Sequence, residues 1–140
     1  MADRFDPDPY LEAWNKHDWD ALVGFLAEDC VYEDVALGER HQGRDDIRNW
    51  IGEMTETLST DFSFESKNAF MAGDDYALEW VFRGTHDRSS PQLPATGKGF
   101  EIPGASVGKL EGGLIKENRD YWSMATFLMQ VGVMPPPPQP

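Results

Sequence analysis

The sequence predicts an α+β fold, with helices in the first third of the chain and strands in the rest. Up to about residue 54, apolar side chains recur three and four residues apart, which is the spacing of amphipathic helices. From Phe62 onward, apolar and polar residues alternate, as they do along half-buried strands. The chain has 140 residues, a length that suits one domain. We therefore expect a single domain over residues 1–134.

The composition excludes several classes of function. The chain has 25 acidic and 12 basic residues, and its formal charge of −13 repels phosphate backbones and anionic membrane surfaces. We therefore expect no nucleic acid and no membrane as partner. The N-terminus has no apolar run of the kind found in signal peptides. The single cysteine, Cys30, cannot form an intrachain disulfide, so we expect a protein of the reducing cytoplasm.

The helical part of the sequence predicts three helices. Two of them lie within residues 9–28 and are joined by a tight connection at residues 16–18, where Asp18 can cap the second helix. The third follows Gly43 and should end near residues 57–60. The apolar residues that define these helices are Tyr10, Ala13, Trp14, Leu22, Phe25, Leu26, Ile47, Trp50, Ile51 and Met54.

The strands are predicted from β-branched and aromatic residues bounded by glycine turns. A first strand covers residues 30–35, and Gly38 and Gly43 bracket a loop. A hairpin follows, with its turn at residues 73–75, and then two strands at 99–110 and 114–123, joined by a glycine turn at 111–113. Residues 85–98 are too rich in proline for a central strand and predict a long loop, and residues 135–140 predict a disordered tail.

The residues that could carry chemistry are acids and aromatics. Metal-binding and nucleotide-binding motifs are missing, and the histidines at positions 17, 41 and 86 are scattered, so no metal and no cofactor is predicted. If the helices cover the concave face of a curved sheet, seven side chains could converge there: Tyr10, Trp14, Asp34, Trp80, His86, Asp120 and Trp122. A carboxylate surrounded by aromatic rings has a raised pKa and can accept and return a proton.

The first part of the chain resembles ketosteroid isomerases. The resemblance runs through residues 10–20 (Tyr-Leu-Glu-Ala-Trp-Asn-Lys-His-Asp-Trp-Asp) and residues 25–34, which end in Asp34. It implies that Asp34 is the base that moves the proton and that Tyr10 donates a hydrogen bond to the substrate oxyanion. The second acid of that family would fall at Ser106, where this chain has a hydroxyl instead.

The second half resembles the SnoaL-like polyketide cyclases. The matching segments are residues 82–86 (Phe-Arg-Gly-Thr-His), 94–97 (Pro-Ala-Thr-Gly), 118–122 (Asn-Arg-Asp-Tyr-Trp) and 130–132 (Gln-Val-Gly). The resemblance implies an acid–base aspartate on the last strand, which would be Asp120, although Ser123 stands where many relatives have an aspartate. Both families share the nuclear transport factor 2-like fold, a cone of three N-terminal helices on a curved, mostly antiparallel sheet with an internal pocket.

These observations favour a cofactor-independent acid–base enzyme that isomerises, cyclises, dehydrates or hydrates a cyclic ketone, polyketide or terpenoid. Asp34 would be the base, Tyr10 would donate to the enolate oxygen, and Asp120 or His86 would assist. Trp14, Trp80, His86, Asn118 and Trp122 would contact the hydrophobic ligand. Ser106 and Ser123 favour the alternative of a non-catalytic binding or interaction module, and an epoxide hydrolase is a third possibility. The resemblance also implies a homodimer.

Overall fold

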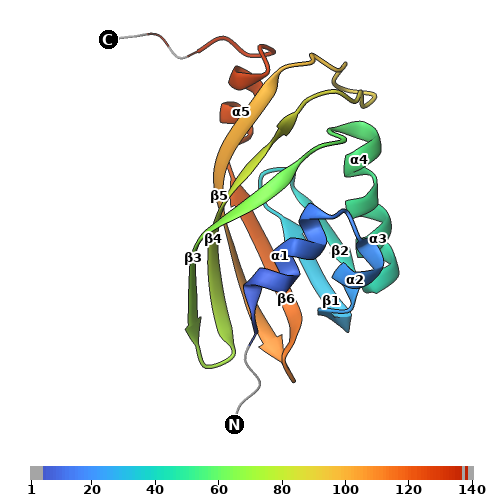
Figure 1. The fold of residues 1–140 in the computed structure, drawn as a ribbon, viewed down its shortest axis with the longest axis vertical. Helices are drawn as coiled ribbons and strands as arrows, with labels where there is room; N and C mark the ends of the chain where they lie inside the picture. The colour runs from blue at the N-terminus through green and yellow to red at the C-terminus, as the bar shows by residue number, and fades with distance from the viewer. Residues whose placement is uncertain (1–4, 137, 139–140) are drawn as a thin grey trace.

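The computed structural model describes residues 5–136 and 138 and has the predicted α+β fold (Figure 1). Its elements follow in this order: α1 (Pro7–Asn15), α2 (Trp19–Val23), β1 (Leu26–Asp34), β2 (Glu39–Gln42), α3 (Arg44–Gly52), α4 (Met54–Thr57), β3 (Ser63–Ala72), β4 (Asp75–Thr85), β5 (Gly99–Glu111), β6 (Leu114–Trp122) and α5 (Met124–Gln130). In the described part of the chain, no helix is long and apolar enough to cross a membrane.

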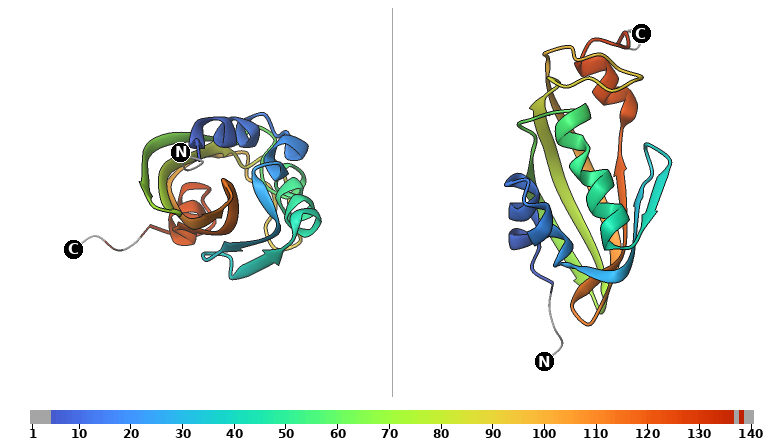
Figure 2. Two further views of the ribbon diagram at one scale, coloured as in Figure 1. Left: turned by 90° about the horizontal axis from the view of Figure 1, so that it is seen from below. Right: turned by 90° about the vertical axis from the view of Figure 1, so that its right-hand side faces the viewer.

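The six strands form one mixed sheet in the order β2-β1-β6-β5-β4-β3. All neighbouring strands are antiparallel except β1 and β6, which run parallel. The sheet curves strongly, and together with α1, α2 and α3 it encloses the interior (Figure 2). The predicted arrangement of N-terminal helices on a curved, mostly antiparallel sheet is therefore confirmed.

The connection between α1 and α2 is the tight turn that the sequence predicts. His17 adopts a positive φ of 54° there, and the Asp18 carboxylate accepts a hydrogen bond from the Ala21 amide at 3.1 Å. The imidazole of His17 stacks on the Phe62 ring at 4.2 Å between centroids, so the turn also fixes α1 and α2 against the start of β3. Because of this packing, the buried residues of α1 face the interior of the sheet.

The first strand and the loop after it differ from the sequence-based prediction. Residues 26–28 were expected to end the second helix, but β1 begins at Leu26, which pairs with Ile115 of β6. Helical spacing and a buried strand both place Leu26 inside, and pairing with β6 decides between them. The predicted loop between Gly38 and Gly43 contains β2, whose residues are polar and show no apolar alternation.

The helices after β2 and β6 also differ from the prediction. The expected third helix is divided into α3 and α4 at Gly52, the residue with the weakest helix propensity in this segment. The last strand ends at Trp122, and Ser123 caps α5 by accepting a hydrogen bond from the Thr126 amide at 3.1 Å. The sequence analysis did not identify α5.

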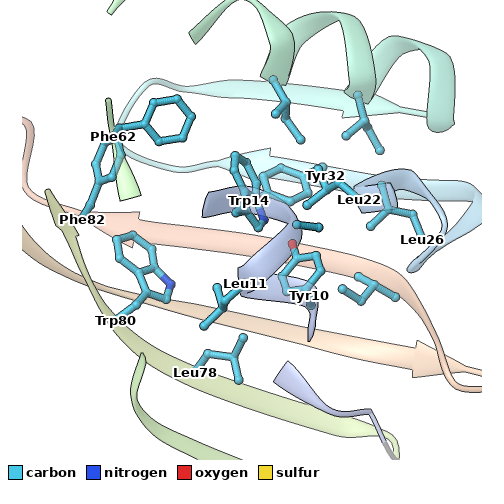
Figure 3. Close-up of a cluster of buried hydrophobic side chains, with 14 of the residues drawn as sticks. Tyr10, Leu11, Trp14, Leu22, Leu26, Tyr32, Phe62, Leu78, Trp80 and Phe82 are labelled. Atoms are coloured by element: carbon cyan, nitrogen blue, oxygen red, sulfur yellow. The ribbon is translucent and has the colours of Figure 1, made fainter. Parts of the chain in front are cut away.

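Aromatic side chains fill much of the interior. Tyr10 and Trp14 are on the buried face of α1, next to Tyr32 of β1 and Trp80 and Phe82 of β4 (Figure 3). Gly104 and Gly108 of β5 leave room for the rings of Trp80 and Tyr76, which lie across them. The sheet can therefore hold large side chains on its concave face without being pushed apart.

The long loop and the tail lie away from the sheet centre. Residues 86–98 have no regular structure, as predicted, and the loop packs beside α5 (Figure 1). Of the predicted disordered tail, Pro135, Pro136 and Pro138 are exposed coil, and residues 137, 139 and 140 lie outside the described residues.

Candidate active site

Asp120 is at the centre of a hydrogen-bonded group on the concave face of the sheet. Its Oδ2 accepts a hydrogen bond from the Tyr32 hydroxyl at 2.5 Å. Its Oδ1 accepts one from the Ser106 hydroxyl at 2.6 Å and one from the Asn118 amide at 2.8 Å. These donors come from β1, β5 and β6, so the sheet itself brings them together.

Two further side chains hold the Ser106 and Asn118 donors in place. The indole N–H of Trp80 donates to the Ser106 hydroxyl at 2.9 Å, and the Tyr76 hydroxyl donates to Asn118 Oδ1 at 2.6 Å. The Ser106 hydroxyl therefore points its hydrogen at Asp120, and the Asn118 amide group is held with its N–H toward the carboxylate. The arrangement presets three donors around one acid, and two further side chains hold two of these donors in place.

The surroundings of Asp120 favour its neutral form at the low end of physiological pH. Burial raises the pKa of Asp120 from 3.8 to about 6, and the nearby charge of Asp34 adds to the rise. The hydrogen bonds from Ser106, Tyr32 and Asn118 oppose this rise, because they stabilise the carboxylate. Asp120 is nevertheless only half-buried, so it lies where the interior still meets solvent.

Asp34 lies beside Asp120 as the sequence analysis expected. The two residues are paired across the parallel strands β1 and β6, so their side chains leave the same face of the sheet. The Asp34 carboxylate accepts hydrogen bonds from the Trp122 indole at 3.0 and 3.1 Å and from the Leu37 amide at 2.9 Å. Burial raises the pKa of Asp34, while these donors lower it.

Tyr10 and Trp14 reach the same region from α1. Burial and the charge of Asp120 raise the pKa of Tyr10 well above its usual value, which places this phenol near the carboxylate. The hydroxyl bound to Asp120 belongs to Tyr32, however, and not to Tyr10. Trp14 packs edge-on against Phe64 at 5.2 Å and against Trp19 at 5.9 Å between ring centroids.

His86 directly follows β4 and begins the long loop. The Thr96 amide donates to its Nδ1 at 3.3 Å, so Nδ1 is an acceptor and the neutral ring carries its proton on Nε2. Nε2 is buried without a hydrogen-bond partner, and burial lowers the pKa of His86. The ring packs against Phe127 at 5.7 Å, and Phe127 packs against Trp122 at 6.4 Å.

The two hollows on the surface lie elsewhere. One, of about 720 Å³, is lined by residues of β3, β4 and β5 including Arg83 and Glu101. The other, of about 530 Å³, lies between α2 and α3 near Trp19 and Arg48. Neither hollow contains Asp34 or Asp120, so neither is the internal pocket that the sequence predicts. Buried aromatic and aliphatic side chains, among them Tyr10, Trp14 and Tyr32, pack together in the interior (Figure 3).

The structure brings together most of the residues expected from the sequence and adds others. Asn118 donates to Asp120, and Trp80 joins them through Ser106. Trp122 donates to Asp34, which is paired with Asp120 across β1 and β6. Tyr32 and Tyr76 were missed, although Tyr32 alternates with Asp34 along β1 and therefore faces the same side. Ser123 is a helix cap and does not join this group. Across residues 5–136 and 138, no group of three His, Cys, Asp or Glu side chains is arranged to hold a metal ion.

The fold is that of ketosteroid isomerase-like and nuclear transport factor 2-like proteins. The SnoaL-like domain model matches residues 8–118, and the chain belongs to this family. Among curated proteins, none matches the chain.

Three solved structures illustrate the similarity. A protein of ketosteroid isomerase-like fold from Catenulispora acidiphila, crystallised with trimethylamine, is 25% identical, with a TM-score of 0.79 over 90% of this chain and 91% of that chain. A protein from Xanthomonas campestris that is suggested to be a polyketide cyclase is 26% identical, with a TM-score of 0.77 over 90% and 93%. An NTF2-like protein of unknown function from Burkholderia pseudomallei shares the fold at 16% identity, with a TM-score of 0.75 over 89% and 92%.

Proposed function

We propose that this protein is a cofactor-independent acid–base enzyme that moves a proton next to a carbonyl group of an apolar small molecule. The supporting observation is the Asp120 carboxylate, which has a pKa of about 6 and three preset donors. A base with a pKa near the working pH accepts a proton and returns it within one turnover. The isomerisation, aldol cyclisation and dehydration or hydration reactions of the family all use such a step.

Asp120 takes the role that the sequence analysis gave to Asp34. The carboxylates of Asp34 and Asp120 are both on the concave face, and the Oδ1 atom of each accepts two hydrogen bonds. Asp120 is the more solvent-accessible of the two, since Asp34 is 7% exposed and Asp120 is half-buried. In this proposal Asp120 removes the proton, and Asp34 raises its basicity by its nearby charge.

The substrate would be apolar because aromatic rings surround both acids. Trp122 donates to Asp34, Trp80 holds Ser106, and Tyr10 and Trp14 cover them from α1. Such rings bind flat apolar molecules, and the phenol groups supply hydrogen bonds to an enolate oxygen. The suggested activity of the Xanthomonas relative as a polyketide cyclase agrees with a substrate of this kind.

The test replaces Asp120 by asparagine, which has nearly the same size. The assay follows by NMR how fast the protons on the α-carbons of two ketones, β-tetralone and a ketosteroid, exchange for deuterium. It measures the proton transfer directly, so the final product need not be known. We expect Asp120→Asn to lower the exchange rate by about 10²–10⁴-fold, the usual contribution of a general base. Asp74→Asn, in the exposed turn between β3 and β4, is the matched control and should exchange at the wild-type rate.

The remaining outcomes separate the alternatives. Exchange that survives in Asp120→Asn but is lost in Asp34→Asn would return the role of base to Asp34. Binding of the ketones without any exchange in the wild type would favour the non-catalytic binding module. The epoxide hydrolase would require an arginine beside the two acids, and Arg119 alternates with Asp120 on β6 and so leaves the opposite face.

A further inference from the structure

A histidine–aspartate pair joins β2 to the first turn of α3, where the Asp46 side chain is exposed and His41 is partly buried. His41 Nδ1 is 3.0 Å from Asp46 Oδ1, and Asp46 Oδ2 accepts a hydrogen bond from the Gln42 amide at 3.1 Å. One turn further along α3, the Trp50 ring stacks on the imidazole, with 4.6 Å between centroids and 18° between planes. The imidazole is therefore fixed from its edge and from its face.

The hydrogen bonds decide which nitrogen of His41 carries the proton. The bonds from His41 and from the Gln42 amide hold the pKa of Asp46 below its usual value, so its carboxylate is ionised. An ionised carboxylate only accepts hydrogen bonds, so Nδ1 is the donor and Nε2 of the neutral ring has a free lone pair. This Nε2 is buried and has no hydrogen-bond partner.

His41 faces the side of the sheet on which Asp120 lies. His41 and Tyr32 are directly paired across the antiparallel strands β1 and β2, so their side chains leave the same face and are neighbours. Tyr32 in turn donates to Asp120. The next pair along these strands on the same face is Asp34 and Glu39, of which Asp34 is buried and Glu39 is exposed. Both already accept hydrogen bonds, from Trp122 and Trp50 respectively, so His41 Nε2 is the acceptor on this side that lacks a partner.

We propose that His41 Nε2 accepts a hydrogen bond from a hydroxyl group of the ligand. The inference rests on the proposed function, since the ligand would be the substrate held near Asp120, and it narrows the substrate to an apolar molecule with a phenol or enol O–H. A buried acceptor without a partner costs free energy, and a ligand hydroxyl would remove that cost. Asp46 is then a positioning residue, because it acts only through the imidazole.

The first experiment tests the orientation without any ligand. Long-range ¹H–¹⁵N NMR spectra of the histidine side chains in mildly alkaline buffer distinguish the two neutral tautomers. We expect His41 to carry its proton on Nδ1, and Asp46→Asn to reduce the population of this form, because an asparagine side chain can also donate to Nδ1. A wild-type His41 that carries its proton on Nε2 would overturn the proposal.

The second experiment uses β-naphthol and its methyl ether, which differ in the O–H donor. Titrations followed by tryptophan fluorescence should show that the wild type prefers the naphthol by about tenfold, as one net hydrogen bond predicts. In His41→Asn the side-chain amide can still donate to Asp46, but no atom takes the place of the Nε2 acceptor. The preference for the naphthol should therefore vanish. His41→Gln places its amide oxygen near the Nε2 position and should keep most of it.

Three results would contradict the proposal: a His41→Asn protein that keeps the wild-type preference, a wild type that binds both probes equally, and a wild type that binds neither. The ¹⁵N signal of Nε2 gives an independent readout, because it should shift on addition of naphthol and not on addition of the ether. The test of the proposed function is independent of this one, because Asp120→Asn is assayed with β-tetralone, a ketone that has no hydroxyl group. Failure of the His41 proposal would therefore leave the proposed function intact.

Discussion

At the scale of single residues, Asp120 combines a half-buried position with three hydrogen-bond donors, and burial and the donors have opposite effects on the charge of its carboxylate. Three hydrogen bonds stabilise the carboxylate, yet burial outweighs them and raises the pKa to about 6. The native protein therefore binds the Asp120 proton more tightly than the unfolded chain does. Stability that depends on this proton is lost as the pH rises through the folded-state pKa.

This linkage predicts how the free energy of unfolding responds to Asp120→Asn. The neutral amide does not bear the cost of a buried charge, so the variant should gain about 1–2 kcal/mol relative to wild type at about pH 7, allowing for partial solvent contact. Below about pH 4 the wild-type acid is protonated in both states, and this gain should disappear. Urea unfolding of both proteins at the two pH values measures the difference.

Asp74→Asn serves as the control, because Asp74 is exposed and its substitution should not change the pH dependence. Asp34→Asn should show a gain in the same direction, since burial also raises the pKa of Asp34. If the difference in unfolding free energy between Asp120→Asn and wild type is the same at both pH values, the Asp120 carboxylate is more exposed in solution than it is in the structure.

At the scale of the element, β5 is shaped by its glycines. A methyl group on Gly108 would overlap the Tyr76 ring and the carbonyl oxygen of Glu117, which belongs to the neighbouring strand. The Tyr76 hydroxyl holds Asn118, and Asn118 holds Asp120. The absence of a side chain at position 108 thus permits the contact that orients the candidate active site.

Gly108→Ala is therefore expected to destabilise the protein by about 2–3 kcal/mol, as over-packing of a tight core does. Gly99→Ala, in the same strand, is the matched control, because a methyl group there would come no closer than 3.8 Å to another atom. Thermal or urea unfolding compares the two. Equal stability of the two variants would mean that Tyr76 does not pack across Gly108 as described.

At the scale of the whole molecule, the convex face of the sheet carries an apolar row. Phe70, Ala77 and Val107 are paired in register across β3, β4 and β5, and Tyr121 of β6 is close to this row. Phe70 is 58% exposed, a large value for a phenylalanine side chain. Contiguous exposed apolar surface of this kind is typical of protein interfaces.

We predict that the convex face forms the interface of a homodimer. Light scattering at micromolar concentration should give twice the chain mass for the wild type, and Val107→Glu, which places a charge in the middle of the row, should give a monomer. Val133→Glu is the control, because Val133 is exposed but lies after α5, away from the sheet. A monomeric wild type would exclude this dimer.

The sequence by itself was enough for the order of helices before strands, without β2 and α5, and for placing the residues around Asp120 on one side of their strand. Local rules decide both: the shift from helical to alternating spacing marks where the strands begin, glycine turns delimit the hairpins, and alternation along one strand places Asn118, Asp120 and Trp122 on one side. Asp34, which ends β1, was identified as the candidate base by the resemblance to ketosteroid isomerases.

Tertiary structure alone decided which groups meet. Leu26 lies in a strand because β6 pairs with it, β2 forms although its residues are polar, and Ser106 is a donor to Asp120 because β5 and β6 are in register. The choice of Tyr32 over Tyr10 as the phenol on Asp120 and the position of His41 beside Tyr32 depend on strand pairing between distant segments. Local spacing contains no information on that register, because it is set by contacts across the whole sheet.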